Sequence, residues 1–380
     1  MKIAFYAPMK SPNHPVPSGD RLMGRLLLEV LRRITSPTEV RLASEFRAYS
    51  DRPDPDKLLK NQSLAAIEAA AVIANWEQTN WVPDIWFSYH PYYKAPDWLG
   101  PVVAERFNCP IITAEASYSI KRAHDGWGPW HGQHEASLRQ ASCHLYMKQR
   151  DRPGLLEVPS SEEQLVHLPP FIDVAPFMSL SEQKSESAIA RTDPIRLITV
   201  AMMRADIKLK SYRFLAEALS GLQQENWTLD IVGDGTARSD VEAAFAEFPE
   251  DRIRWHGIVA PENVPKLLAG ADVFAWPGFN EAYGLAYLEA QACGLPVVAQ
   301  KTAGVPEVVR SGETGLLTQE DDVKAFREAL RNLMENRPER RRLGSQARSF
   351  VHQERSLAQA QTIIANALEL VLEHHSKRQN

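Results

Sequence analysis

Two glutamates eight residues apart, Glu281 and Glu289, lie in the segment of the chain that is richest in residues able to do chemistry. Apolar runs at 273–276 and 297–299 flank this segment, so Glu281 is expected in the loop after a strand and Glu289 one to two turns into the next helix. Ligands bind at that edge of an open α/β sheet. The helix start, near Tyr283, Gly284 and Leu285, offers backbone N–H groups that suit a phosphate. The spacing predicts a sugar-nucleotide site, although glutamates near a helix N-terminus also occur simply because they complement the helix dipole.

Positive charge that suits a diphosphate follows the run at 195–200. Arg204 comes first, and Lys208 and Lys210 precede a helix expected from about Tyr212. Arginine binds phosphate as a bidentate fork and lysine as a compact charge. We therefore predict that Arg204 and Lys210 neutralise a diphosphate leaving group. The alternative is a solvated loop of surface cations, which fits Arg204 least because of its place close to a strand end.

Three other turns after expected strands are candidates for binding the sugar nucleotide, which would donate its sugar. Gly233 lies in a Gly-Asp-Gly turn that resembles half of a dinucleotide-binding loop. The backbone near Ile258 is expected to read a nucleobase edge, and Gly304 to bring amides to the same phosphates. A tight β–α connection or ordinary packing is the alternative for each.

In the first half of the chain, candidate acceptor-side residues also stand at strand ends. Gly19 lies in a loop between the first strand and a helix, where it is expected to approach the leaving phosphate or the acceptor. His90 ends the run at 85–89 and Glu115 the run at 111–114, and both are usual proton acceptors for a hydroxyl. Their alternative role is that of hydrogen-bonded strand-end residues. The histidines in 124–134 lack zinc-site spacing, so no metal is expected.

Short apolar runs alternate with helical patterns along the whole chain, which predicts an α/β fold with parallel sheets. The expected strands are 2–7, 40–43, 85–89, 111–114, 143–147, 165–168, 195–200, 228–232, 253–255, 273–276, 297–299 and 315–317. We predict two Rossmann-like domains that face a central cleft, an N-terminal acceptor-binding domain at 1–177 and a C-terminal nucleotide-sugar-binding domain at 193–355. A polar linker at 178–192 joins them, and a C-terminal helix at 356–380 is expected to pack back across the boundary.

Composition narrows the class of protein. Apolar residues make up 44% and charged residues 24% of 380 residues, as in ordinary globular proteins. A net charge of −5 argues against a dedicated nucleic-acid binder. Three scattered cysteines and an N-terminal strand in place of a signal peptide favour the cytoplasm. The basic amphipathic helix expected at 21–33 leaves attachment to the inner face of a membrane open, although packing on the sheet is preferred.

The stretches 277–298, 304–307 and 311–317 resemble the donor-site signature of the retaining glycosyltransferases of family 4, which have the GT-B fold. Arg204 and Lys210 match that family's diphosphate-binding pair. The resemblance implies that Glu281 contacts the donor sugar, that Glu289 contacts the ribose and that the amides of 283–285 hold the diphosphate. It also implies a metal-independent hexosyltransferase without a cofactor, which uses a nucleoside-diphosphate sugar and a hydroxyl acceptor and retains anomeric configuration.

The chain departs from the family on the acceptor side. Glu115 stands where relatives usually carry a histidine, so either this carboxylate replaces it or His90 does its work. Ser18-Gly19 also replaces the common Gly-Gly pair. Two alternatives remain open: a sugar-nucleotide-binding protein without transfer activity, and a GT-B sugar-nucleotide epimerase.

Overall fold

The computed structural model describes residues 1–34, 39–158, 164–178 and 194–379. They form two compact units, one of Met1–Pro169 with Leu357–Asn380 and the other of Pro170–Ser356. The predicted boundary at 177 differs from this division, because residues 170–178 belong to the second unit. There Ile172 forms a parallel β-bridge with Ser356, and its N–H donates to Arg355 O at 2.9 Å. Nearly all of the predicted linker lies outside the described residues.

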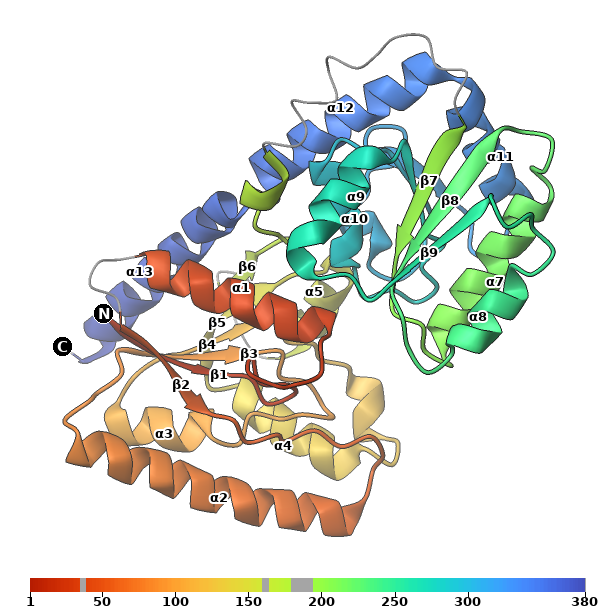
Figure 1. Cartoon of the computed structure of the whole chain (residues 1–380). Coiled ribbons are helices and arrows are strands. Elements are labelled where there is room, and N and C mark those ends of the chain that lie inside the picture. The colour runs from red at the N-terminus through yellow and green to blue at the C-terminus, as the bar shows by residue number, and fades with distance from the viewer. Residues whose placement is uncertain (35–38, 159–163, 179–193, 380) are drawn as a thin grey trace. The chain divides into compact units, whose positions relative to one another are not determined.

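Six parallel strands form the sheet of the first unit, in the order β2-β1-β3-β4-β5-β6 (Figure 1). Their bounds are β1 Lys2–Tyr6, β2 Glu39–Ser44, β3 Ile85–Tyr89, β4 Ile111–Ala114, β5 Ala141–Tyr146 and β6 Leu165–His167. The central strands are the most buried: every residue of β3 and β4 is buried. Apolar runs without alternation, such as Ile-Trp-Phe-Ser-Tyr in β3, are typical of strands covered on both faces.

The sheet of the second unit repeats this plan, with the order β12-β11-β10-β7-β8-β9 and parallel neighbours throughout. Its strands are β7 Ile195–Val200, β8 Trp227–Val232, β9 Ile253–Gly257, β10 Val273–Ala275, β11 Val297–Gln300 and β12 Gly315–Thr318. Each of the twelve expected strands is present. The prediction of an α/β fold with two parallel sheets is therefore confirmed.

Helices cover both faces of each sheet (Figure 1). In the first unit, α2 Pro55–Gln78, α3 Gly100–Phe107 and α4 Gly128–Leu138 lie on one face, and α1 Gly19–Ile34 and α13 Leu357–Gln379 on the other; the shorter helices are η1 Ile120–Ala123, η2 Gln149–Asp151 and α5 Arg152–Glu157. In the second unit, α7 Ile207–Ser220, α8 Arg238–Ala244 and α11 Val323–Glu335 lie on one face, and α9 Val264–Gly270, α10 Leu285–Ala292 and α12 Arg337–Glu354 on the other; its 3-10 turns are η4 Pro261–Asn263 and η5 Val305–Glu307.

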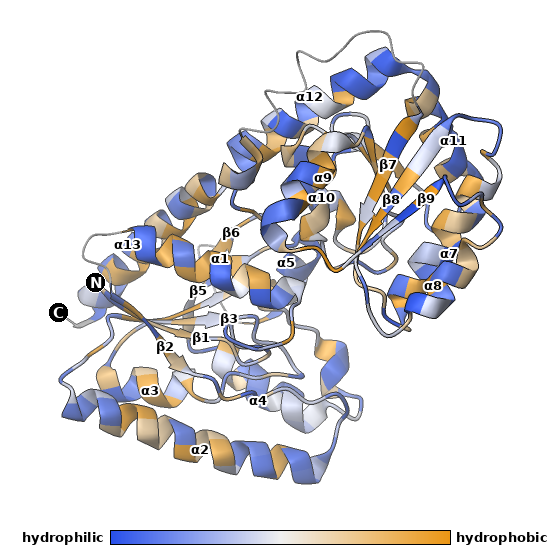
Figure 2. Ribbon diagram, viewed as in Figure 1, coloured by the Kyte–Doolittle hydropathy of each residue, from blue (hydrophilic) through white to orange (hydrophobic). Residues whose placement is uncertain are grey.

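The helices are amphipathic, and local signals fix their ends. Orange and blue alternate along α1 and α2 in Figure 2, as expected for helices with one face on a sheet. Asp54 caps α2, because its carboxylate accepts from the N–H groups of Asp56 and Lys57, and Pro55 occupies the first position of the helix. None of the described helices is long and apolar enough to cross a membrane.

The C-terminal helix α13 belongs to the first unit and packs against α1. The Gln361 amide donates to Arg33 O at 3.2 Å, and His375 Nε2 lies 2.9 Å from Asn108 O. The apolar face of the basic helix α1, which includes Met23 and Leu27, is buried. The preferred interpretation of this helix, packing within the fold, therefore agrees with the structure.

Candidate functional site

The carboxyl edge of the second sheet brings together the candidate donor residues of two neighbouring strands. β7 leads through Arg204 into α7, and β10 leads through the loop at 276–284 into α10. These strands pair directly, so their loops leave the same edge side by side. The loops are also tied together, because the Phe279 N–H donates to Ser211 Oγ on α7 at 3.2 Å.

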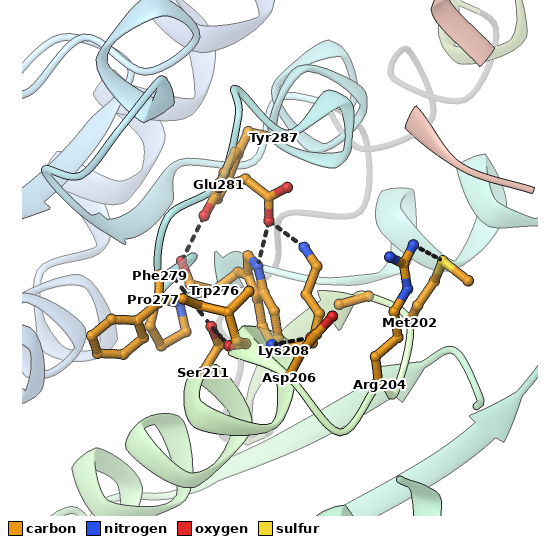
Figure 3. Close-up of polar contacts among 12 residues, drawn as sticks. Met202, Arg204, Asp206, Lys208, Ser211, Trp276, Pro277, Phe279, Glu281 and Tyr287 are labelled. Carbon is orange, nitrogen blue, oxygen red and sulfur yellow. Dashed lines mark hydrogen bonds and ion pairs between the residues drawn. The ribbon is translucent and has the colours of Figure 1, made fainter. Parts of the chain in front are cut away.

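Glu281 lies in this edge and has a cation beside it (Figure 3). Lys208 Nζ donates to Glu281 Oε2, and the two side chains are 20% and 18% exposed. The Trp276 indole N–H points at the same oxygen from 3.5 Å, and Lys208 Nζ lies 5.6 Å from the centre of the Trp276 ring. The predicted loop carboxylate is thus half-buried and partly neutralised, yet still open to solvent.

Lys208, and not Lys210, contacts Glu281. The helix begins at Ile207 instead of the expected Tyr212, because the Asp206 carboxylate caps it by accepting from the Lys208 N–H at 2.9 Å. Residues two apart on a helix face different directions. Lys210 accordingly turns away and pairs with Asp321 at 2.9 Å.

Arg204 stands in the loop between β7 and α7 with its side chain exposed. Its guanidinium donates to the sulfur of Met202 at 3.1 Å. In the described part of the chain it forms no ion pair with a carboxylate. Figure 3 shows it on the same side of the loop as the Lys208 amine. A guanidinium without an acidic partner is available for an anionic ligand.

The start of α10 presents a helix N-terminus at this edge. Gly284, its N-cap, has φ 78°, a left-handed conformation that glycine adopts without strain. A side chain at that position would also approach Glu281 Cγ to 2.9 Å. The first N–H groups of a helix lack partners within the helix. The N–H groups of Gly284 and Leu285 therefore lie at a helix start, where an anion is favoured, while the Tyr283 side chain is buried.

Glu289 lies on the second turn of α10 and is only partly exposed, and its carboxyl group forms no ion pair or hydrogen bond with the residues that the structure describes. Burial of the carboxyl group raises the pKa of Glu289 to about 7. A carboxyl group without a partner at a ligand-binding edge is available to hydroxyl groups. The two glutamates thus differ, since Glu281 has a cation beside it and Glu289 does not.

The other predicted donor-site residues differ in whether they are free to contact a ligand. The Gly233 N–H donates to Gly257 O at 2.9 Å, and a side chain at Gly233 would overlap the backbone of Ala201. The Gly304 N–H donates to Glu281 O at 3.0 Å, so both amides are engaged inside the protein. Ile258, in contrast, follows β9 with 85% of its surface exposed.

A buried group of charges occupies the carboxyl edge of the first sheet. His90 and Glu115 follow β3 and β4, as predicted, and both adopt left-handed backbone conformations with φ 57° and 56°. Such conformations are rare outside glycine and concentrate at functional sites. His90 Nδ1 lies 3.2 Å from Asp20 Oδ1, and Glu115 pairs with Lys148 at 3.0 Å.

This arrangement shifts the pKa values of the two candidate bases, His90 and Glu115, in opposite directions. Burial favours the neutral imidazole, but Glu115 and Asp20 outweigh it and raise the pKa of His90. Burial favours the neutral carboxyl group, but the charges of Lys148 and His90 outweigh it and lower the pKa of Glu115. Tyr89 also donates to Glu115, at 3.2 Å. Glu115 is therefore held ionised, and His90 holds a proton more tightly than a free histidine.

Gly19 begins α1 on the same edge, and a side chain there would meet no atom within 4 Å. Ser18 caps the helix by accepting from the Arg21 N–H at 3.2 Å. Of the 124–134 histidines, His131 and His134 are buried on α4. Among the residues that the structure describes, no group of three His, Cys, Asp or Glu side chains is placed to hold a metal.

Sequence reasoning did not select Asp20, Lys148 or Trp276. Lys148 comes one residue after the strand expected at 143–147, so its place next to Glu115 followed from two adjacent parallel strands. Trp276 ends the strand expected at 273–276, and its indole N–H is directed at Glu281, the polar partner that a buried tryptophan needs. Asp20 gave no signal beyond its place beside Gly19.

Comparison with known proteins finds similar sequences among glycosyltransferases. The profile of the family described as Glycosyl transferases group 1 matches residues 194–336. A D-inositol 3-phosphate glycosyltransferase of Corynebacterium glutamicum is 24% identical over 349 residues, which cover 84% of this chain and 82% of the relative. An N-acetyl-alpha-D-glucosaminyl L-malate synthase of Bacillus anthracis is 29% identical over 195 residues, 50% of each chain.

Solved structures share the fold. Anabaena HepE in complex with UDP has a TM-score of 0.71 and 17% identity, and the match covers 97% of this chain and 100% of HepE. Sucrose-phosphate synthase from Thermosynechococcus elongatus has a TM-score of 0.74 and 18% identity, and the match covers 98% of this chain and 99% of the synthase. The two six-stranded parallel units are those of a GT-B fold.

Proposed function

We propose that this chain, whose residues 194–336 match the family described as Glycosyl transferases group 1, transfers a hexosyl group from a nucleoside-diphosphate sugar to a hydroxyl acceptor with retention of configuration. One observation carries the proposal: a guanidinium that forms no ion pair with any described residue, a helix N-terminus and two carboxylates share one edge of the second sheet. A diphosphate between two hydroxyl-bearing sugars offers charges and hydrogen-bond donors that complement this set.

In this proposal each donor residue acts on a different part of the donor. Arg204 and the N-terminus of α10 bind the diphosphate, and Lys208 adds charge as the bond between the anomeric carbon and the phosphate oxygen breaks. Glu281 binds hydroxyls of the transferred sugar and Glu289 those of the ribose. The exposed side chain of Ile258 packs against the base.

The electron pair of the broken bond leaves with the diphosphate. The acceptor oxygen then bonds to the anomeric carbon on the face that the leaving group occupied. The proton of the acceptor hydroxyl passes to the departing phosphate or to His90. We assign the protein's share of this step to His90 with Asp20, because Lys148 lowers the basicity of Glu115 whereas Asp20 and Glu115 raise that of His90.

The test measures release of nucleoside diphosphate from UDP-, GDP- and ADP-sugars by chromatography, starting with UDP-glucose because HepE structures contain UDP and UDP-glucose. Arg204→Ala and Glu281→Ala should each lower turnover at least about 100-fold, the loss expected when a group that stabilises transition-state charge is removed. Arg213→Ala, an exposed arginine on α7, is the matched control and should be unchanged.

Three outcomes separate the candidate functions. Turnover that survives both substitutions refutes the transferase site. A donor that binds without transfer or hydrolysis identifies a binding protein, and conversion of the donor to its epimer without release of nucleotide identifies an epimerase. Turnover that persists in EDTA would support the metal-independent mechanism, and loss of turnover that Mg²⁺ restores would exclude it.

A further inference from the structure

Aromatic side chains form a row that starts at His90 on the first unit. Tyr92 and Tyr93 follow β3, and Trp127 lies just before α4. The His90 and Tyr92 rings stack with centres 5.3 Å apart, Tyr92 and Tyr93 are 5.4 Å apart, and Tyr93 and Trp127 are 5.2 Å apart. Tyr92 and Tyr93 are half-buried, and Trp127 is 8% exposed. We call His90, Tyr92, Tyr93 and Trp127 the aromatic row.

Cations lie against this row. Lys94 Nζ lies 5.2 Å from the centre of the Trp127 ring and 5.9 Å from that of Tyr93, and Arg122 lies 4.8 Å from the centre of the Tyr93 ring. Arg122 is already paired with Asp125 at 2.8 Å. In the described part of the chain, Lys94 forms no ion pair.

A third cation approaches from the loop after β2. Arg47 lies 4.7 Å from the centre of the Tyr49 ring, and its guanidinium donates to Met9 O at 3.0 Å. Burial is the chief cause of the raised pKa of Tyr92. Tyr49 raises this pKa further, and the positive charge of Arg47 lowers it. Like Lys94, Arg47 has no ion pair with a carboxylate within the described ranges. Lys94 therefore lies against the aromatic row, and Arg47, which lies over the Tyr49 ring, adds positive charge near Tyr92.

We propose that the acceptor is a saccharide that carries an anionic group, that its sugar rings stack on the aromatic row, and that Lys94 and Arg47 bind the anion. This inference rests on the proposed transferase function and names the class of its acceptor. The C–H face of a pyranose is slightly positive and packs against the negative face of an aromatic ring. A carboxylate or phosphate beside that ring supplies the charge that the two cations lack.

The structure also favours a substrate surface over a purely structural cluster. Trp127 and the neighbouring Trp130, 8% and 1% exposed, lie in a core cluster with Leu58, and they support Tyr93, which packs against that cluster. Tyr92 and Tyr93, in contrast, keep exposed surface and lead directly to His90, the proposed proton acceptor. A sugar on Tyr92 would stand next to the imidazole that takes its proton.

The experiment measures binding to the full chain by titration calorimetry. The probes are a hexamer of galacturonic acid, glucose 6-phosphate and neutral maltohexaose, so that a carboxylate, a phosphate and an uncharged saccharide are compared. We expect at least one anionic probe to bind 10-fold or more tightly than maltohexaose. Tyr93→Ala should weaken that binding at least 10-fold, Tyr93→Phe should keep it, and Lys94→Gln should weaken anionic probes alone.

Lys60→Gln, an exposed lysine on α2, is the control and should bind all probes unchanged. Equal binding of maltohexaose and the anionic probes, binding unchanged by Tyr93→Ala and Lys94→Gln, or no binding of any probe would each overturn the inference. Release of nucleotide from donor alone, measured on the same variants, tests the transferase function separately. Donor hydrolysis should be the same in Lys60→Gln as in the unsubstituted protein, and its absence from the unsubstituted protein would remove the transferase function while leaving the binding result intact.

Discussion

At the scale of single residues, the two glutamates of the second unit occupy different electrostatic surroundings. Glu281 has the Lys208 ammonium beside it, whereas Glu289 is crowded by its neighbours and has a pKa raised to about 7. A carboxyl group that titrates near 7 changes charge in the physiological range. Donor binding is therefore expected to depend on pH through Glu289.

We predict that donor affinity falls as the pH drops below about 7. Ribose hydroxyls donate to the ionised carboxylate, so below its pKa the group must lose a proton before the donor binds, which weakens affinity up to about tenfold per pH unit. Calorimetric titration of a nucleotide sugar from pH 5.5 to 8.5 measures this slope. A sugar diester of the diphosphate has no titration of its own in that range. Glu289→Gln should bind weakly and without the slope; a slope that persists in this variant would contradict the assignment.

Lys208 and Lys210 give a second prediction at this scale. Lys208→Met removes the cation beside Glu281 and should lower kcat/KM for donor turnover about 10- to 100-fold, the range expected for a charge-assisted contact. Lys210→Met removes an exposed ion pair with Asp321 and should change it less than about threefold. Steady-state kinetics of both variants decide the matter. A larger loss in Lys210→Met would instead favour the lysine spacing of the family.

At the scale of elements, the turn that follows β11 packs against the loop between β10 and α10 and restrains it. The Gly304 N–H donates to Glu281 O, and the close approach leaves no space for a side chain, because a Cβ at Gly304 would stand 1.5 Å from Ala282 O. The φ of Gly304 is −98°, so the requirement for glycine is steric and not conformational. This turn therefore fixes the position of Glu281 and of the start of α10.

We predict that Gly304→Ala displaces this loop, weakens donor binding and destabilises the second unit by at least about 1–3 kcal/mol, the typical cost of overpacking. Gly132→Ala is a matched control inside α4, where a side chain meets nothing within 4 Å. That change should stabilise the first unit by about 0.5–1 kcal/mol, because alanine favours a helix over glycine. Urea unfolding of both variants measures the two signs. Wild-type stability and donor affinity in Gly304→Ala would contradict this account.

The strands could be predicted from the sequence because each is a short apolar run next to a turn. Ile85–Tyr89, Ile111–Ala114 and Ile195–Val200 agree to the residue with the runs. Helix starts were harder, since α7 begins five residues before the expected Tyr212. There the capping carboxylate of Asp206 outweighs a polar, lysine-rich segment that resembles a loop.

The sequence predicts those candidate site residues that lie in one loop and the helix after it. It predicts less well those whose contacts depend on the direction in which a side chain points. Glu281 and Glu289 follow from one segment of sequence. The choice between Lys208 and Lys210 depends on which face of a helix each lysine occupies, because consecutive residues are rotated by about 100° and these two by about 200°. The partner of Glu115, Lys148, follows another strand and lies 33 residues later in the chain, and a single sequence does not show which charges meet.

At the scale of the whole molecule, the chain passes between its two units twice, after Pro169 and after Ser356. The unit of the first sheet therefore contains both ends of the chain, and α13 completes it by packing on α1. The two units also differ in their buried titratable groups. His134 and His144 are fully buried in the first unit, whereas the donor residues of the second lie at its edge.

We predict that acid destabilises the first unit selectively. Burial lowers the pKa of His134 and of His144 to about 4, from an ordinary value of 6.5. Above pH 6.5 both are neutral whether the chain is folded or unfolded. Below it the unfolded chain binds protons that the folded unit excludes, so the free energy of unfolding falls as the pH drops from 6.5 to 4, by at most about 3 kcal/mol per histidine. Calorimetric scans at pH 7.5 and 5 should show one transition that shifts down strongly with acid and another that a bound nucleotide sugar raises.

His144→Gln serves as the control for this prediction, because it removes one of the two buried imidazoles and with it part of the acid sensitivity. The raised pKa of His90 acts in the opposite direction, since protonation of His90 beside Asp20 stabilises the folded unit as the pH falls. A His90→Gln variant should therefore be more sensitive to acid than the unsubstituted protein, and His144→Gln less. If both variants kept the pH dependence of the parent, the buried histidines would not set the acid stability of the first unit.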